Sequence, residues 1–162
     1  MENNTDFSLP LDVEKIIPHR LPMRMIDTLE KIEGETAEAI VTLAEDQIFI
    51  DTFGGLDPVA FVEMIAQTYA SWRGYEGRAN GEPMRDGFMV AIRKFKHLEH
   101  AKVGEQLTIK VAKSGEFESF TIAEGEVYRQ DTLLAQAQIS LWIPDEIDGV
   151  VNISAGSEGD LS

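Results

Sequence analysis

The chain has 162 residues, of which 43% are hydrophobic, so it is long enough to bury the core of one domain. Its formal net charge of -15 repels nucleic-acid phosphates and anionic lipid headgroups, which makes both poor candidates as partners. It has no cysteine, which excludes disulfides, thiol nucleophiles and thiolate metal sites.

The first ten residues, MENNTDFSLP, are polar and acidic and lack the basic and apolar regions of a signal peptide. No apolar run reaches the length needed to span a membrane. We therefore expect a cytosolic protein. Residues 12–17 are expected to form a short helix that ends at Pro18, since the residue before a proline is pushed out of the helical conformation. Pro22 is expected to keep the following segment extended.

Most of the chain has the pattern of strands. Apolar and polar residues alternate, which predicts strands, over residues 36–43, 106–111 and 133–143. Weaker alternation predicts further strands over residues 23–32, 87–98 and 119–128. The connections SGE at 114–116 and RQD at 129–131 are short and polar, so neighbouring strands are expected to pair antiparallel.

Residues 58–73, PVAFVEMIAQTYASWR, carry apolar side chains at helical spacing and predict one long helix. Asp57 and Pro58 indicate its start, and Gly74 and Gly77 its end. Since this helix is apolar nearly all round, it must be wrapped by other elements. One buried helix among roughly six strands predicts an α+β protein in which a curved antiparallel sheet is wrapped around the helix, the hotdog arrangement.

After Pro144 the sequence loses its aromatic residues and its strand periodicity and gains Gly, Ser and acidic residues. A segment of this composition cannot bury enough apolar surface to become ordered. We therefore expect a hotdog domain over residues 1–144 and an acidic, disordered tail over residues 145–162.

Glu63 and Gln67 lie four residues apart on the predicted helix, so they share one face, and Ser71 extends the same polar line. Burying an ionised carboxylate without a partner costs roughly several kcal/mol, and no basic residue lies near Glu63 on the helix. Two interpretations stay open for Glu63. It is either a functional carboxylate in a solvated cleft or a structural one, hydrogen-bonded to backbone or to a dimer partner.

The three histidines are scattered and lack the spacing of a metal-binding motif, so no zinc or iron site is expected. His19 lies on a loop between two prolines, where either a structural or a catalytic role is open. His97 and His100 have charged neighbours and are expected to be exposed, without a chemical role.

Three segments resemble the 3-hydroxyacyl-acyl-carrier-protein dehydratases. IIPHRLPMRMID (residues 16–27) resembles the PHR-aromatic-P stretch near the amino terminus of that family, and VEMIAQ (residues 62–67) resembles its helical EAMAQ motif. GFMVAIRKFKHLEHAKVGEQLTI (residues 87–109) is similar to its strand, basic-aromatic and P-G-D segment. Together they follow the family's order over most of residues 12–143, which implies a hotdog fold and dehydration of a 3-hydroxyacyl thioester.

In that family a helix carboxylate acts together with a histidine from the opposite subunit. By resemblance, Glu63 is the catalytic carboxylate, and Gln67 supports it at the substrate. The family's histidine belongs to a GHFPG loop, whereas this chain reads FIDTFGGLDP, with Asp51 or Thr52 at the histidine's place. The resemblance also implies that Phe53 and Gly55 of this loop are substrate-binding residues.

The glycine whose backbone N–H polarises the thioester carbonyl in the family corresponds to Pro58, which has no N–H. The donor would then move to Val59 or Ala60, which makes Val59 a substrate-binding candidate. A pattern with PHR kept and GHFPG lost resembles a branch of dehydratases linked to aryl polyenes. In that case His19 is the nearest substitute for the missing base.

The leading prediction is a 3-hydroxyacyl-thioester dehydratase of fatty-acid or polyene-type synthesis that needs no metal or organic cofactor. A thioesterase is an alternative because hotdog proteins also hydrolyse acyl thioesters. A non-catalytic subunit that binds acyl chains or completes a partner dehydratase is another. An acyl carrier protein is expected to deliver the substrate and to dock at Arg93, Lys94 and Lys96. A homodimer or a dimer of dimers is expected, since pairing across a two-fold axis covers an exposed edge strand.

Overall fold

A computed structural model describes residues 7–83 and 87–144 of the chain. In chain order, its elements are β1 (Leu11–Asp12), the 3₁₀ helix η2 (Val13–Lys15), β2 (Thr28–Glu33), β3 (Thr36–Thr42), α1 (Val59–Ala79), β4 (Phe88–His97), β5 (Gln106–Phe117), β6 (Phe120–Arg129) and β7 (Thr132–Trp142). The predicted disordered tail over residues 145–162 lies outside the described residues.

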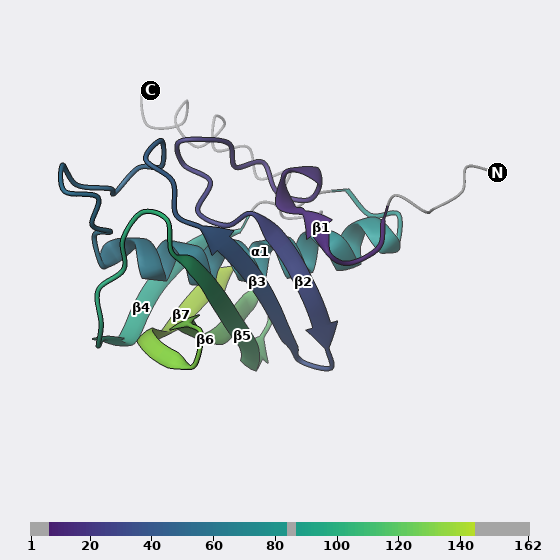
Figure 1. Ribbon diagram of the computed structural model, residues 1–162. Helices are drawn as coiled ribbons and strands as arrows, with labels where there is room; N and C mark the ends of the chain where they lie inside the picture. The colour runs from purple at the N-terminus through teal and green to yellow at the C-terminus, as the bar shows by residue number, and fades with distance from the viewer. Residues whose placement is uncertain (1–6, 84–86, 145–162) are drawn as a thin grey trace, which may run out of the picture.

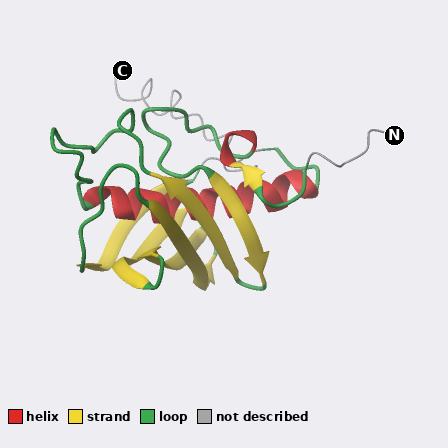
Figure 2. Cartoon of the chain, in the orientation of Figure 1, coloured by secondary structure: helices red, strands yellow, loops and turns green. Residues whose placement is uncertain are grey.

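All seven strands form one antiparallel sheet in the order β1-β2-β3-β5-β6-β7-β4. The sheet curves around α1, which lies along its inner face (Figure 1). Figure 2 shows the same arrangement by type of element, with helix α1 lying against the strands. The predicted α+β hotdog fold is confirmed. Within the described residues, no helix is both long enough and apolar enough to cross a lipid bilayer.

The core lies between α1 and the sheet. The alternating apolar residues that predicted strands point inward, where they are buried against the helix. At Gly125 of β6 the two layers approach so closely that a Cβ atom would lie 2.4 Å from Cγ2 of Ile65. The buried side chains include Ala37, Ala39 and Val41 of β3, Leu107, Ile109 and Val111 of β5, and Phe61, Met64 and Ile65 of α1.

Helix α1 begins at Val59, one residue after the predicted start at Pro58, but it ends well beyond the predicted end. The Val59 N–H donates to Oδ1 of Asp57 at 3.0 Å, so the aspartate satisfies a free donor of the first turn. The helix continues through Gly74 and Gly77 to Ala79, and the predicted end at these glycines is therefore wrong. Gly74 is needed for packing instead, because a Cβ atom there would lie 2.3 Å from the backbone oxygen of Ile16.

Three other predicted bounds need correction. The helix expected over residues 12–17 is a single 3₁₀ turn, and the strand expected from residue 23 begins only at Thr28. The turn expected at residues 114–116 belongs to β5, which continues to Phe117. A register shift between Lys113 and Gly115 keeps this part of β5 paired with β6, so the turn falls at Glu118 and Ser119.

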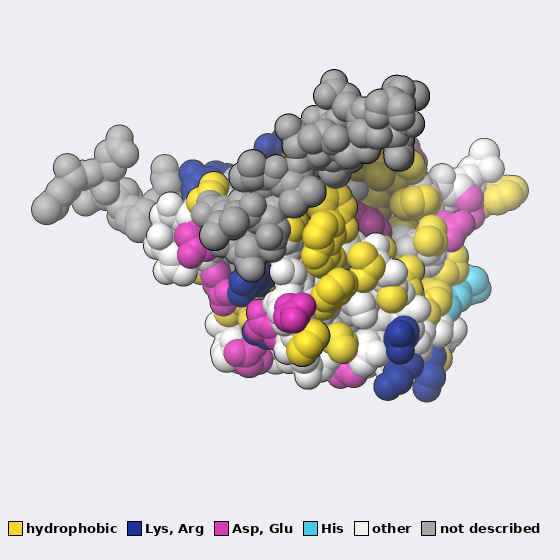
Figure 3. Space-filling model, turned by 180° about the vertical axis from the view of Figure 1, so that it is seen from behind, with side chains coloured by type: hydrophobic (Ala, Val, Ile, Leu, Met, Phe, Trp, Pro, Cys, Tyr) yellow, Lys and Arg dark blue, Asp and Glu magenta, His cyan; other side chains and the backbone are white. Residues whose placement is uncertain are grey.

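Strand β4 forms one edge of the sheet and carries exposed apolar side chains. Figure 3 shows the back of the molecule, where apolar side chains run as a band and Lys and Arg side chains gather near one corner. The large apolar residues of β4 that are exposed are Phe88, Met89, Val90, Ile92 and Phe95.

Candidate active site

Gln67 connects helix α1 to the loop that carries His19. Its Oε1 accepts the backbone N–H of Met25 at 2.7 Å, and its Nε2 donates to the backbone oxygen of Met23 at 3.0 Å. The same Nε2 donates to Oε1 of Glu63 at 2.9 Å, one helical turn away. Because Gln67 is buried, these bonds fix both the loop and the Glu63 carboxylate relative to the helix.

His19 lies opposite Glu63. Its Nε2 is 4.0 Å from Oε1 of Glu63, and the two side chains are 31% and 29% exposed. This separation is too long for a direct hydrogen bond but leaves room for a hydroxyl group or a water that contacts both. Nδ1 of His19 is buried and has no hydrogen-bond partner within residues 7–83 and 87–144. The structure thus brings together a carboxylate and an imidazole that lie 44 residues apart in the sequence.

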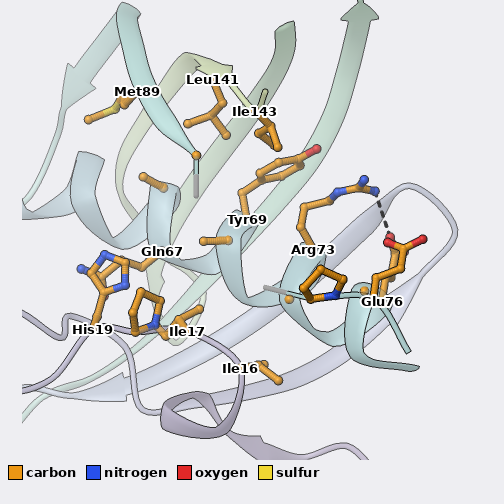
Figure 4. Close-up of a pocket in the computed structure, with 18 of the residues that line it drawn as sticks. Ile16, Ile17, His19, Gln67, Tyr69, Arg73, Glu76, Met89, Leu141 and Ile143 are labelled. Atoms are coloured by element: carbon orange, nitrogen blue, oxygen red, sulfur yellow. Dashed lines mark hydrogen bonds and ion pairs between the residues drawn. The ribbon is translucent and has the colours of Figure 1, made fainter. Parts of the chain in front are cut away.

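Both residues line a cavity of ≈ 360 Å³ that runs along α1. Figure 4 shows His19 and Ile17 on one side of the helix and Met89, Leu141 and Ile143 on the other. The side chains that line the cavity near its middle are mostly apolar. From the N-terminal loop they are Ile16, Ile17 and Pro18, from α1 they are Ala66, Tyr69 and Ala70, and from the sheet and its flank they are Met89, Leu141 and Ile143.

The end of the cavity away from Glu63 is polar. The guanidinium of Arg73 is 3.1 Å from the Glu76 carboxylate, and this ion pair is drawn as a dashed line in Figure 4. The indole N–H of Trp72 also donates to Glu76, at 2.7 Å. Burial raises the pKa of the Tyr69 phenol, although the nearby Thr121 and Arg73 side chains act in the opposite direction, so its hydroxyl stays neutral near pH 7.

Ser71 does not belong to the site. Eight residues separate it from Glu63, which rotates its side chain by about 80° from that face at 3.6 residues per turn. It is buried on another side of the helix, where its hydroxyl donates to the backbone oxygen of Thr68 at 2.8 Å. The expected polar line therefore consists of Glu63 and Gln67 only.

The other predicted substrate-binding residues lie outside this cavity. Phe53 is 96% exposed and lines, with Gly55 and His100, a separate open depression. Val59 is 47% exposed. Its N–H is bonded to the Asp57 carboxylate, and the Ala60 N–H donates to the Asp57 backbone oxygen at 3.0 Å. Both backbone donors expected to polarise a carbonyl are thus already engaged within the chain, and the substrate-binding roles stay predictions.

The predicted docking residues Arg93, Lys94 and Lys96 are exposed on β4. The register with β7 shifts between Arg93 and Lys96, and Lys94, within this shift, has a φ of 53°. They do not line the cavity, although Met89 of the same strand does.

The remaining histidines lie away from the cavity. Half-buried His97 stacks at a tilt on Phe61, and His100 is exposed. Within the described ranges, no three His, Asp or Glu side chains are grouped so that they could hold a metal ion.

Tyr69, Arg73 and Glu76 line the cavity but were not predicted as site residues. They follow Glu63 and Ala66 at helical spacing, and this spacing is the one sequence feature that indicates that they lie on the same side of the helix. Their place in the site could not be predicted because the helix is apolar nearly all round. A pattern of this kind does not distinguish side chains that face a cavity from those that face the core.

Comparison with known families gives a match over almost the whole described chain. Residues 11–152 match the profile of the ApeP-like family, described as ApeP dehydratase. The chain is 27% identical over 137 residues to the 3-hydroxyacyl-[acyl-carrier-protein] dehydratase FabZ of Natranaerobius thermophilus, a match that covers 80% of this chain and 92% of the relative. It is 28% identical over 140 residues to the FabZ of Methylobacterium radiotolerans, covering 82% and 87% of the two chains.

Solved structures show the same fold. The dehydratase heterocomplex ApeI:P from Xenorhabdus doucetiae is similar with a TM-score of 0.77 and 22% sequence identity, over 86% of this chain and 95% of that one. A hypothetical thioesterase from Streptococcus pneumoniae, solved with coenzyme A, has a TM-score of 0.56 at 12% identity, over 72% and 84% of the two chains.

Proposed function

Because the chain belongs to the ApeP-like dehydratase family, we propose that it removes water from 3-hydroxyacyl thioesters with Glu63 and His19 as its acid–base pair. The observation that carries this proposal is that His19 and Glu63 both line the cavity, with Nε2 of His19 4.0 Å from Oε1 of Glu63. A 3-hydroxyacyl group between them has a proton to lose at C2 and a hydroxyl to lose at C3.

In this reaction, Nε2 of His19 takes the proton from C2, and the electron pair of that C–H bond forms the C2–C3 double bond. The C3–O bond breaks at the same time. The departing hydroxyl takes a proton from the Glu63 carboxyl group and leaves as water. Gln67 does not react, but its hydrogen bond to Glu63 holds the carboxyl group toward the cavity.

The loss of the loop histidine supports a role for His19. Asp51, one of the two residues at the place of that histidine, is engaged in its own loop, since its Oδ1 accepts the N–H groups of Phe53 and Gly55. His19 is therefore the histidine of this chain whose distance from Glu63 fits a shared substrate.

The test follows enoyl absorbance and free thiol with 3-hydroxybutyryl-pantetheine and crotonyl-pantetheine as substrates. Glu63→Gln and His19→Asn should each lower kcat/KM by at least about 100-fold, the range that general acid–base catalysis contributes. The matched controls Glu99→Gln and His100→Asn change exposed side chains outside the cavity and should leave turnover as it is.

Each alternative function has its own result in this assay. Thiol release without enoyl formation would make the protein a thioesterase. The absence of both, with binding retained, would make it a non-catalytic subunit. Equal activity of wild type and Glu63→Gln would remove this carboxylate from the mechanism.

We further propose that the substrate is carried by an acyl carrier protein that docks at Arg93, Lys94 and Lys96. Carrier proteins are acidic, so a chain of net charge -15 repels them except where basic residues gather. The double charge reversal Arg93→Glu and Lys96→Glu should reduce turnover of carrier-linked substrate in a salt-dependent way. An equal loss with the pantetheine substrate would contradict docking at this site.

The proposed assembly is a homodimer in which β4 of one copy pairs with β4 of the other. The exposed apolar residues of this edge strand support it. Because the similar structure from Xenorhabdus doucetiae is a dehydratase heterocomplex, a different hotdog subunit is the competing occupant of the same edge. A cytosolic location is part of the proposal, and cell fractionation tests it.

A further inference from the structure

One stripe of helix α1 forms the floor of the cavity over nearly its whole length. The lining residues of α1 recur every three or four positions, which places them along a single face. Four members of this stripe are small: Ala66, Ala70, Gly74 and Gly77. Larger side chains at Ala66 and Ala70 would enter the cavity, so these two small residues leave a groove open between Ile17 on one side and Leu141 on the other.

The groove has a polar beginning and a polar end. It begins at Glu63 and His19, continues past the partly exposed methyl groups of Ala66 and Ala70, and reaches the Arg73–Glu76 ion pair. An alkyl chain is stabilised along the apolar part because it leaves water there. Beyond the apolar part, at the ion pair, burial of the alkyl chain is no longer favourable. Glu76 already binds Arg73 and Trp72, and an alkyl group there would displace water from charged groups.

The helix gives this groove a length scale. At a rise of about 1.5 Å per residue, Ala66 lies about 4.5 Å, Ala70 about 10 Å and Arg73 about 15 Å from Glu63 along the axis. An extended chain advances about 1.3 Å per bond, since three backbone bonds span about 3.8 Å. Starting at C3 beside Glu63, about three to four further carbons reach Ala66, about eight reach Ala70 and about twelve reach Arg73.

We infer that Ala66 and Ala70 determine the acyl-chain length that this protein accepts, with the acyl chain lying extended along α1 from Glu63 toward the Arg73–Glu76 pair. This inference rests on the proposed function for the position of the thioester. A branched side chain at Ala70 blocks the far part of the groove and spares the near part. The same side chain at Ala66 blocks the groove soon after the reacting carbons.

The experiment compares Ala66→Leu and Ala70→Leu with 3-hydroxy thioesters of pantetheine that carry butyryl, octanoyl and tetradecanoyl chains. In Ala70→Leu, the ratio of tetradecanoyl to butyryl kcat/KM should fall by at least about tenfold, since several methylene groups lose their burial. The ratio of octanoyl to butyryl should change by less than about twofold. In Ala66→Leu, both ratios should fall by at least about tenfold. Ala70→Val adds less bulk and should shift the ratios in the same direction by a smaller factor.

The matched control is Ala79→Leu, the same substitution at an exposed position of the same helix that does not line the cavity. It should leave both ratios unchanged. Affinities of non-hydrolysable thioether analogues with the same three chains are measured in parallel by calorimetry, so binding is read independently of turnover.

The two readouts separate the failure of this inference from the failure of the proposed function. If no substrate is turned over but Ala70→Leu weakens the tetradecanoyl analogue selectively, the groove binds the chain and the dehydratase proposal fails. If both leucine variants are folded by circular dichroism and show wild-type length dependence in turnover and binding, the chain does not lie along α1 and the inference is wrong.

Discussion

Gln67 is the residue that holds the candidate site together, because it bonds to Glu63 and to the loop that follows His19. Replacing it with leucine keeps most of its volume but leaves the Met25 N–H without its acceptor in a buried position. An unsatisfied buried donor costs roughly 1–3 kcal/mol, so Gln67→Leu should lower the free energy of unfolding in urea by about that amount. It should also reduce turnover, because Glu63 loses its hydrogen bond.

Gln138→Leu is the control for this prediction. The Gln138 amide also donates to a carboxylate, that of Glu124 at 3.3 Å, but this pair is exposed. Its loss should change the free energy of unfolding by less than about 0.5 kcal/mol. Equal stability losses in the two variants would show that the buried bonds of Gln67 contribute nothing specific.

At the residue scale, local spacing predicted one half of the site and could not predict the other. Glu63 and Gln67 were recognised because four residues on a helix define a face. The distance between His19 and Glu63 depends on how the N-terminal loop folds back over α1. No local sequence pattern predicts this. The predicted roles of Phe53 and Gly55 rest on the family resemblance alone, and within one chain these residues lie in a different depression from Glu63.

At the scale of elements, helix α1 contains two glycines with opposite expected effects. Gly77 has open surroundings, since a Cβ atom would come no closer than 3.9 Å to Glu82. Gly77→Ala should therefore stabilise the protein by about 0.5–1 kcal/mol through helix propensity. Gly74→Ala has the same gain in propensity but places its methyl group against the backbone oxygen of Ile16.

Gly74→Ala should therefore destabilise the protein by roughly 1–3 kcal/mol, the cost of forcing extra atoms into a packed contact. Because Ile16 belongs to the segment that leads to His19, turnover should fall as well. Thermal unfolding and the enoyl assay on both variants check this. Stabilisation by Gly74→Ala equal to that by Gly77→Ala would mean that the loop moves aside without cost.

The same glycines explain where the predicted elements were wrong. A glycine is a good signal for the end of a helix when only the local backbone is considered. Here the helix continues through both, because burial against the sheet and the N-terminal loop outweighs their low propensity. Strand β5 passes its predicted turn for a similar reason, since pairing with β6 is kept through a register shift. The number and type of the long elements could be predicted from periodicity, but these ends depend on tertiary contacts.

At the scale of the whole molecule, the proposed homodimer depends on the β4 edge. Ile92→Glu introduces a charge in the middle of this edge, where wild-type Ile92 is 48% exposed, and should convert the proposed homodimer to a monomer at micromolar concentration. Light scattering coupled to size exclusion measures this. Leu21→Glu, at a side chain of similar exposure on the N-terminal loop, should remain a dimer. A wild-type protein that is monomeric in isolation and associates only with another hotdog subunit would contradict the homodimer.

The position of β4 in the sheet also bears on how the protein is made. Strand β4 is fourth of the seven strands in the sequence but last in the sheet, and its sheet neighbour is β7, the last strand of the described chain. During synthesis, β4 emerges from the ribosome before the strand that it needs, and its pairing must wait for β5, β6 and β7. The strand proposed to join two copies is thus made early and fixed in place late. Association of nascent chains through an ordered β4 edge is thereby postponed until the sheet around α1 is complete.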